Sequence, residues 1–281
     1  MIKLPNASKI LRFPETRQFG AYRSIFPHEL WYFPAKMNTH LAKYLILSYS
    51  NSGDKVLDPF AGAFTIPVIA SLEGRIGIGV EIEKSFCMYA GIAKNRAKKL
   101  LGFNELYIIH GDSRMLSQLV KNLSPVDCII TSPPYEGQVD DKRNLDRDRV
   151  RLLLKGYDPE QYIRLGQARW HYGEKDPRNI GWVTGRKYRE GLRKVFSEFK
   201  KVLKDDGAVV IVVKNSIRRG QLKRNDMLMV RLMECSGFIL KDHLLFEIPS
   251  TSIWRRIWEK RGVFDIDLKY EHILVFKKKS D

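Results

Sequence analysis

Four short apolar runs, each ending in a polar or tight turn, constrain the fold of this chain more than any other feature. They cover residues 55–58, 75–81, 106–110 and 126–130. Short apolar runs bounded by turn residues are typical of buried strands, and helical patterns at 66–72 and 84–100 separate them. Strands that alternate with helices predict an α/β fold with a parallel sheet. At 281 residues, one such domain with an insertion accounts for the whole chain.

Three of the predicted strands have an acidic residue at or just after their carboxyl end. Asp58 closes the first strand, Glu81 closes the second, and Asp112 follows the third. Ligands of open α/β sheets bind at the carboxyl ends of the strands, so we expect the three carboxyls to lie close together. The spacing from Asp58 to Glu81 fits a βαβ unit whose second acid binds ribose hydroxyls. The sequence therefore predicts a nucleoside-binding site at this edge.

The fourth predicted strand ends in Thr131-Ser132-Pro133-Pro134-Tyr135. Two prolines fix the backbone and remove two donors, which leaves the local carbonyls as free acceptors. The Tyr135 ring can stack on a planar base. This combination favours a site that holds a base by its exocyclic amino group. The alternative is an ordinary Pro-Pro turn with Tyr135 packed as a core residue.

The order of these motifs resembles that of the S-adenosylmethionine-dependent DNA amino-methyltransferases, the N4-cytosine and N6-adenine DNA methylases. The resemblance implies that Ser132, Pro133, Pro134 and Tyr135 are catalytic. It also implies cofactor-binding roles for a larger set, in which Glu81 binds the ribose and Asp112 lies near the adenine. That set comprises Phe33 and Lys36 of an N-terminal motif, Asp58, Pro59, Phe60, Ala61 and Gly62 of the first cofactor motif, Glu81 and Asp112.

The same resemblance implies a seven-stranded Rossmann-like sheet with a terminal antiparallel hairpin, whose last strands we expect at 238–248 and 272–276. We divide the chain into an irregular N-terminal arm (1–30), a cofactor-binding half with the catalytic motif (31–135), an inserted segment (136–187) and the rest of the core (188–281). The inserted segment is too long and polar for a simple connection, so we expect it to recognise the target.

In this family a serine at the first position of the catalytic motif usually accompanies N4-cytosine methylation. The resemblance therefore implies a site-specific enzyme that methylates cytosine in double-stranded DNA, with the target base flipped out of the helix. N6-adenine methylation and amino-directed methylation of tRNA or rRNA bases are alternatives. A further alternative is a degenerate protein that binds DNA or cofactor without turnover, because Ala63-Phe64 stands where the family usually has Ser-Gly.

Composition agrees with a nucleic-acid partner. The formal net charge is +17, and such an excess favours association with polyanions. Three widely separated cysteines match no zinc spacing, so we expect free thiols, no metal and a reducing cytoplasm. We expect no membrane segment. The sequence indicates neither the recognition site, nor the oligomeric state, nor whether a restriction nuclease accompanies the protein.

Overall fold

A computed structural model describes residues 4–14, 22–31, 36–101, 105–137, 176, 178–218, 221–249 and 266–279. Its strands are β1 (Lys9–Arg12), β2 (Lys55–Asp58), β3 (Ile76–Glu81), β4 (Leu106–His110), β5 (Val126–Thr131), β6 (Leu203–Lys214), β7 (Ser216–Arg218), β8 (Gln221–Lys223), β9 (Phe238–Glu247) and β10 (Tyr270–Lys278). Its α-helices are α1 (His28–Trp31), α2 (Thr39–Tyr49), α3 (Thr65–Leu72), α4 (Lys84–Leu101), α5 (Leu116–Leu119), α8 (Gly185–Val202) and α9 (Asn225–Cys235). Short 3-10 turns cover η1 (Ser113–Met115), η2 (Ile180–Trp182) and η3 (Ile266–Lys269).

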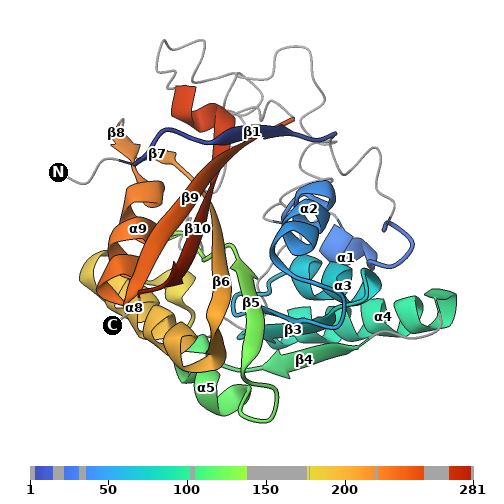
Figure 1. Cartoon of the computed structure of the whole chain (residues 1–281). Helices are drawn as coiled ribbons and strands as arrows, with labels where there is room; N and C mark the ends of the chain where they lie inside the picture. The colour runs from blue at the N-terminus through green and yellow to red at the C-terminus, as the bar shows by residue number, and fades with distance from the viewer. Residues whose placement is uncertain are drawn as a thin grey trace, which may run out of the picture.

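The fold is an α/β Rossmann-like layer structure built on a mostly parallel sheet (Figure 1). The strand order is β1-β9-β10-β6-β5-β2-β3-β4, and β7 and β8 form a separate ribbon. Strands β6, β5, β2, β3 and β4 pair in parallel, whereas β10 pairs antiparallel with both β6 and β9. The four apolar runs of the first half are therefore neighbouring parallel strands, and their carboxyl ends share one edge.

The sheet has eight strands, so the prediction of seven is wrong by one. The additional strand is β1, which lies in the arm that we expected to be irregular and pairs in parallel with β9. Its four residues, two adjacent apolar side chains between two basic ones, show no strand periodicity in the sequence. β1 forms because β9 offers an open edge, and it buries Leu11 in the core.

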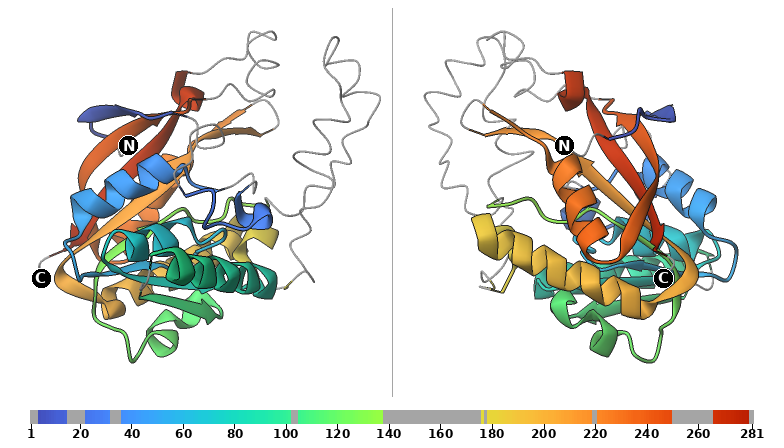
Figure 2. Two further views of the ribbon diagram at one scale, coloured as in Figure 1. Left: turned by 90° about the vertical axis from the view of Figure 1, so that its right-hand side faces the viewer. Right: turned by 60° about the vertical axis from the view of Figure 1, so that its left-hand side comes forward.

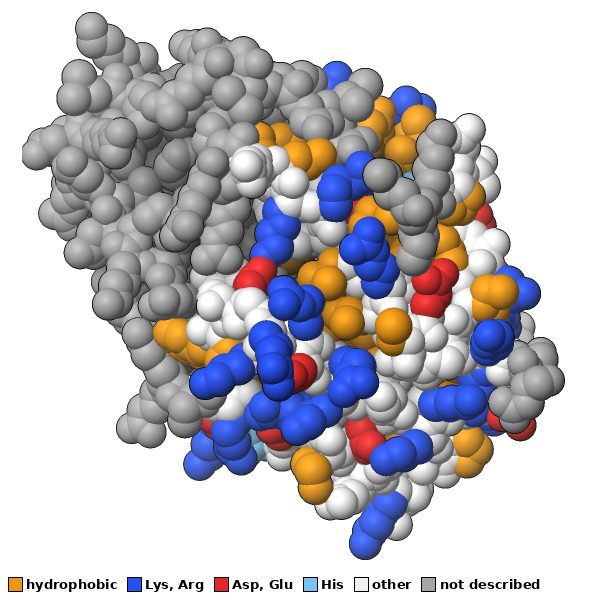
Figure 3. Space-filling view, turned by 90° about the vertical axis from the view of Figure 1, so that its left-hand side faces the viewer, with side chains coloured by type: hydrophobic (Ala, Val, Ile, Leu, Met, Phe, Trp, Pro, Cys, Tyr) orange, Lys and Arg blue, Asp and Glu red, His pale blue; other side chains and the backbone are white. Residues whose placement is uncertain are grey.

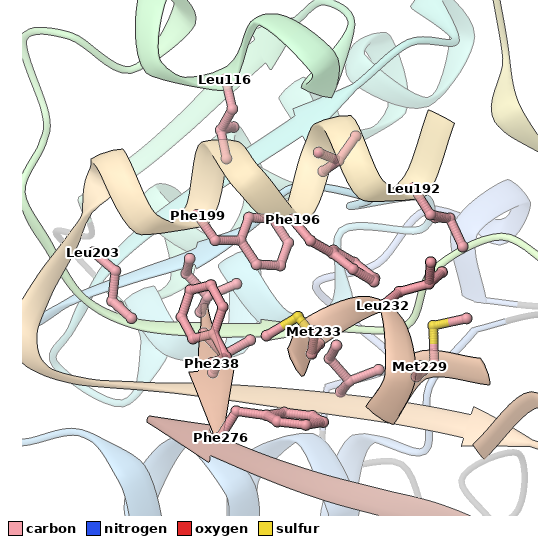
Figure 4. Packing of buried hydrophobic residues seen from close by; sticks show 14 of the residues in the cluster. Leu116, Leu192, Phe196, Phe199, Leu203, Met229, Leu232, Met233, Phe238 and Phe276 are labelled. Carbon is pink, nitrogen blue, oxygen red and sulfur yellow. The ribbon is translucent and has the colours of Figure 1, made fainter. Parts of the chain in front are cut away.

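Helices cover both faces of the sheet (Figure 2). On one face α2 and α3 pack over the sheet, and on the other α5, α8 and α9 do so. The periodic apolar residues of α8, such as Phe196 and Phe199, interlock with Met233 of α9 and Phe276 of β10 (Figure 4). Within the described residues, no helix has the length and apolar character needed to cross a bilayer.

Candidate active site

A cavity of about 490 Å³ opens at the carboxyl ends of β2, β3, β5 and β6. It brings together every predicted site residue except one, because Phe33 lies outside the described residues. The predicted residues that line it are Lys36, Asp58, Pro59, Phe60, Ala61, Gly62, Glu81, Asp112, Ser132, Pro133, Pro134 and Tyr135. Residues that are far apart in sequence meet here because parallel strands end at a common edge.

Asp58 is the most buried carboxyl of the cavity, with 5% of its surface exposed. Its Oδ1 accepts hydrogen bonds from Thr131 Oγ1 (2.6 Å) and from the backbone N–H of Phe60 (3.0 Å). Burial raises the pKa of Asp58 from 3.8 to about 7, and the nearby Glu81 carboxyl adds to the rise. Oδ2 accepts no hydrogen bond from the described residues, so this oxygen is available to a ligand.

Glu81 holds the glycine turn of the first motif against β3. Its Oε2 accepts from the backbone N–H of Gly62 (2.7 Å), and its Oε1 accepts from that of Glu83 (2.9 Å). Burial raises the pKa of Glu81 from 4.5 to about 7. Each carboxylate oxygen has more than one lone pair, so both keep capacity for hydroxyl donors such as those of a ribose.

The unusual Ala63-Phe64 stretch adopts a strained turn. Phe64 has φ 55° and ψ 28°, and it is the only non-glycine residue with positive φ in the part of the chain that the structure describes. Its ring is fully buried over Gly79 of β3, where a Cβ would lie only 2.5 Å from Phe64 Cε1. Left-handed backbone costs a phenylalanine about 1–2 kcal/mol. Burial of the ring in space left by the glycine offsets that cost.

Asp112 is already engaged by a cation. Arg114 pairs with it through Nε and Nη2, at 3.0 and 2.6 Å, and donates from the same Nη2 to the carbonyl of Arg178 (2.8 Å). Asp112, which the resemblance places near the adenine, is therefore connected through Arg114 to Arg178, near the C-terminal end of the inserted segment.

Asn179 and Ile180 line the cavity, although no sequence motif indicated them. Asn179 Nδ2 donates to Glu83 Oε1 (2.8 Å). Asn179 Oδ1 accepts from the N–H of Gly181 (2.9 Å), so Asn179 caps the start of η2. Ile180 belongs to the core cluster under α8. An Asn before a short apolar stretch is a weak turn signal, and only the fold reveals its position beside the cofactor motifs.

The Ser132–Tyr135 motif is held from two sides. The Tyr188 hydroxyl donates to the carbonyl of Pro134 (2.8 Å), and the Lys214 N–H donates to the Tyr135 hydroxyl (2.8 Å). The Ser132 hydroxyl and the Pro133 carbonyl make no hydrogen bond with the described residues. The motif is thus anchored at Pro134 and Tyr135, while its serine and first carbonyl keep acceptor capacity at the cavity.

Lys36 precedes helix α2 and lines the cavity. Its Nζ lies 3.6 Å from the centroid of the Trp31 ring. A cation over an aromatic face is stabilised by the ring quadrupole. Within the described residues, no group of three or more His, Cys, Asp or Glu side chains could hold a metal ion.

Comparison with known proteins identifies the family of this chain. A family described as DNA methylase matches residues 5–94 and 126–281. Among curated relatives, a tRNA (guanine(10)-N2)-dimethyltransferase of Methanothermobacter thermautotrophicus is 33% identical over 39% of this chain and 31% of its own length. The orphan methyltransferase M.BamHII of Bacillus amyloliquefaciens is 44% identical over 24% of each chain.

A third relative, the DNA adenine methyltransferase YhdJ of Escherichia coli, is 47% identical over 19% of this chain and 18% of its own length. The matched stretches cover less than a third of each of these relatives, whose names point to different targets. The family match, in contrast, extends over both halves of the sheet and the catalytic motif. The chain therefore belongs to the S-adenosylmethionine-dependent DNA methylase family.

Proposed function

We propose that this protein transfers a methyl group from S-adenosylmethionine to the exocyclic N4 amino group of cytosine in double-stranded DNA. One observation carries the proposal: Ser132 and the Pro133 carbonyl line the cavity without a partner among the described residues, next to a fixed Tyr135 ring. Two acceptors beside a stacking face suit an amino group attached to a planar base.

The cavity residues fit the cofactor on chemical grounds. Asp58 and Glu81 offer buried carboxyl oxygens to the hydroxyl and amino groups of the cofactor. Gly62 takes φ 46° and lets the backbone approach a ligand closely. When bound, S-adenosylmethionine supplies an electrophilic sulfonium methyl group.

The chain's own residues act by positioning. The amino nitrogen of cytosine is a poor nucleophile because its lone pair is delocalised into the ring. Hydrogen bonds from its two N–H groups to Ser132 Oγ and the Pro133 carbonyl favour a pyramidal nitrogen and aim the lone pair. Catalysis is then mainly orientation and electrostatics, without a covalent intermediate on the protein.

A base inside a duplex cannot reach this cavity, so the target has to be flipped out. Tyr135 supplies the face on which the flipped base stacks. The hydrogen bond from Lys214 N–H fixes the direction of this ring before the base arrives. A preset ring lowers the ordering cost when the base binds.

Helix α8 is the part of the described structure best suited to hold the DNA backbone. Its exposed face carries Arg186, Lys187, Arg189, Arg193 and Lys194. Figure 3 views the molecule from the side of α8 and α9, where Lys and Arg side chains gather. Tyr188 of the same helix contacts the catalytic motif, so phosphates beside a flipped base would lie near these cations.

The inserted segment 136–187 is proposed to read the sequence, and most of it lies outside the described residues. Exchanging residues 138–175 for another sequence should change which site is methylated, because base contacts specify whereas phosphate contacts only position.

Mass spectrometry tests the reaction directly. The purified protein is incubated with S-adenosylmethionine carrying an isotopically labelled methyl group and with duplex DNA or tRNA, and the digested nucleosides are analysed. Labelled N4-methylcytosine in DNA is the expected product. N6-methyladenine would leave the reaction class intact and correct the base, and label in tRNA alone would move the substrate to RNA.

Two variants make this experiment specific. Ser132→Ala removes one proposed acceptor and should lower turnover while cofactor affinity is retained, whereas Asp206→Asn, at an exposed carboxyl of β6, is the matched control. Cofactor binding without label in any nucleic acid would favour the degenerate, non-catalytic alternative.

A further inference from the structure

Glu271 stands on the wall of the cavity, although no motif indicates it. It is the second residue of β10 and pairs with Lys214 of β6. Because β10 runs antiparallel to β6, its first residues lie where β6 ends, at the edge that carries the catalytic motif. Antiparallel pairing thus adds a fourth carboxyl to a site whose other acids follow parallel strands.

The Glu271 carboxyl differs from the other acids of the cavity. The carboxyls of Asp58, Glu81 and Asp112 all accept hydrogen bonds from the protein. The Glu271 carboxyl makes no hydrogen bond with the described residues. Burial raises the pKa of Glu271, and the charge of Lys214 opposes that rise. In its protonated form a carboxyl can donate a hydrogen bond as well as accept one.

Glu271 lies near the ring on which the base is proposed to stack. The Tyr135 hydroxyl bonds to the backbone of Lys214, which is the register partner of Glu271. A base on this ring, with its amino group at Ser132 and Pro133, turns its other edge atoms toward the remaining wall. Flipped bases are commonly read through these edge atoms.

The atom beside the amino group distinguishes the bases. Cytosine and adenine carry an unprotonated ring nitrogen there, N3 or N1, which accepts a hydrogen bond. Guanine carries an N–H (N1) on one side of its amino group and an unprotonated nitrogen (N3) on the other. A neutral carboxyl complements the ring nitrogen of cytosine or adenine, whereas a carboxylate does not.

The geometry points to Glu271 as a specificity-determining residue that donates a hydrogen bond from its carboxyl to the ring nitrogen beside the target amino group. The inference rests on the proposed function and deepens it, because it names the ring atom of cytosine or adenine that the same site reads.

A chemical double-mutant cycle tests it. Methylation is measured on duplexes that carry cytosine or 3-deazacytosine at the target position, which differ in the ring nitrogen; 1-deazaadenine is used instead if adenine is the base methylated. The native protein should prefer the natural base by roughly two- to tenfold in kcat/KM, the range for one hydrogen bond. Glu271→Ala should lose this preference, whereas Glu271→Gln, which keeps a donor, should retain it.

The pH dependence of this preference gives a second readout. The groups that face Glu271 from its neighbours are Lys214 on β6, Phe246 on β9, which does not titrate, and Tyr135 in the catalytic motif. As pH rises through the pKa of Glu271 the donor is lost, so the native preference should shrink. The preference of Glu271→Gln should stay constant.

The outcomes separate the two proposals. If the native protein methylates no base, the proposed function fails and this inference falls with it. If the native protein methylates cytosine or adenine and Glu271→Ala discriminates against the deaza base as well as the native protein does, only the role of Glu271 is refuted.

Discussion

Asp58→Asn should stabilise the cofactor-free protein at alkaline pH while weakening its cofactor site. Both hydrogen bonds to Asp58 end on Oδ1, so an asparagine oriented with its oxygen in that place keeps them. The variant removes only the negative charge that burial disfavours. Comparison with this variant therefore measures what ionisation of Asp58 costs the folded protein.

The magnitude follows from the pKa of Asp58, about 7 in the folded protein against an ordinary 3.8. Because the folded-state value is the higher one, folding favours the protonated carboxyl. Its contribution is fully present below about pH 4 and is lost as pH rises through about 7. At about 1.4 kcal/mol for each unit of pKa, Asp58 should remove about 2–3 kcal/mol of stability between pH 5 and pH 8.

Urea unfolding of the cofactor-free protein at pH 5 and pH 8 measures this effect. The difference between the two pH values should be smaller in Asp58→Asn than in the native protein by about 2–3 kcal/mol. Asp206→Asn changes the net charge equally at an exposed position and should leave the difference unaltered. An equal pH dependence of the native protein and Asp58→Asn would refute the reasoning, because Asp58 would then ionise without a folding cost.

Four further predictions concern individual side chains and one basic helix face. Glu81→Gln should weaken S-adenosylmethionine binding by about 1.5–3 kcal/mol in calorimetric titration above pH 7, where the carboxyl is ionised and a charged acceptor becomes neutral; unchanged affinity would contradict a ribose role. Phe64→Ala should lower the free energy of unfolding by about 3–5 kcal/mol, and the double variant Phe64→Gly with Gly79→Ala should lose less than the two single changes added together. Tyr135→Phe leaves the Lys214 N–H without its acceptor and should cost about 1–3 kcal/mol in chemical denaturation, while the stacking ring and most turnover remain. Gln should replace Lys187, Arg189, Arg193 and Lys194 together. The slope of log K for DNA binding against log[salt] should then become shallower by roughly 0.9 for each phosphate that these cations no longer neutralise. The same replacement of Lys200 and Lys201, at the other end of α8, is the control.

The parallel half of the fold was readable from the sequence because buried parallel strands are apolar throughout and end in recognisable residues. Asp58, Glu81 and Ser132 were found this way, and the comparison confirms the family that their order indicated. The individual roles of these residues stay predictions.

Other features depend on tertiary pairing that leaves no local pattern. The strand β1 exists only because β9 has an open edge, and Glu271 reaches the cavity only through antiparallel pairing. Asn179 sits in polar sequence that resembles any loop until the fold brings it to Glu83. The departure from the family pattern at Ala63-Phe64 was visible in the sequence. Gly79, which leaves room for the Phe64 ring, lies on β3, and the sequence alone does not show that the two residues meet.

The way the inserted segment joins the sheet sets where it can be exchanged in a chimaeric protein. Its two ends are fastened to each other, because Gly137 N–H donates to the Val183 carbonyl and the Gly185 N–H donates to Glu136. A graft that begins after Gly137 therefore closes a loop whose ends already meet, at a cost that grows only slowly with graft length. The second junction has to precede Asp176, since Asn179 and Ile180 line the cavity and Ile180 also belongs to the core of the host. A second junction at residue 187 would replace Asn179 and Ile180, which line the cavity of the host.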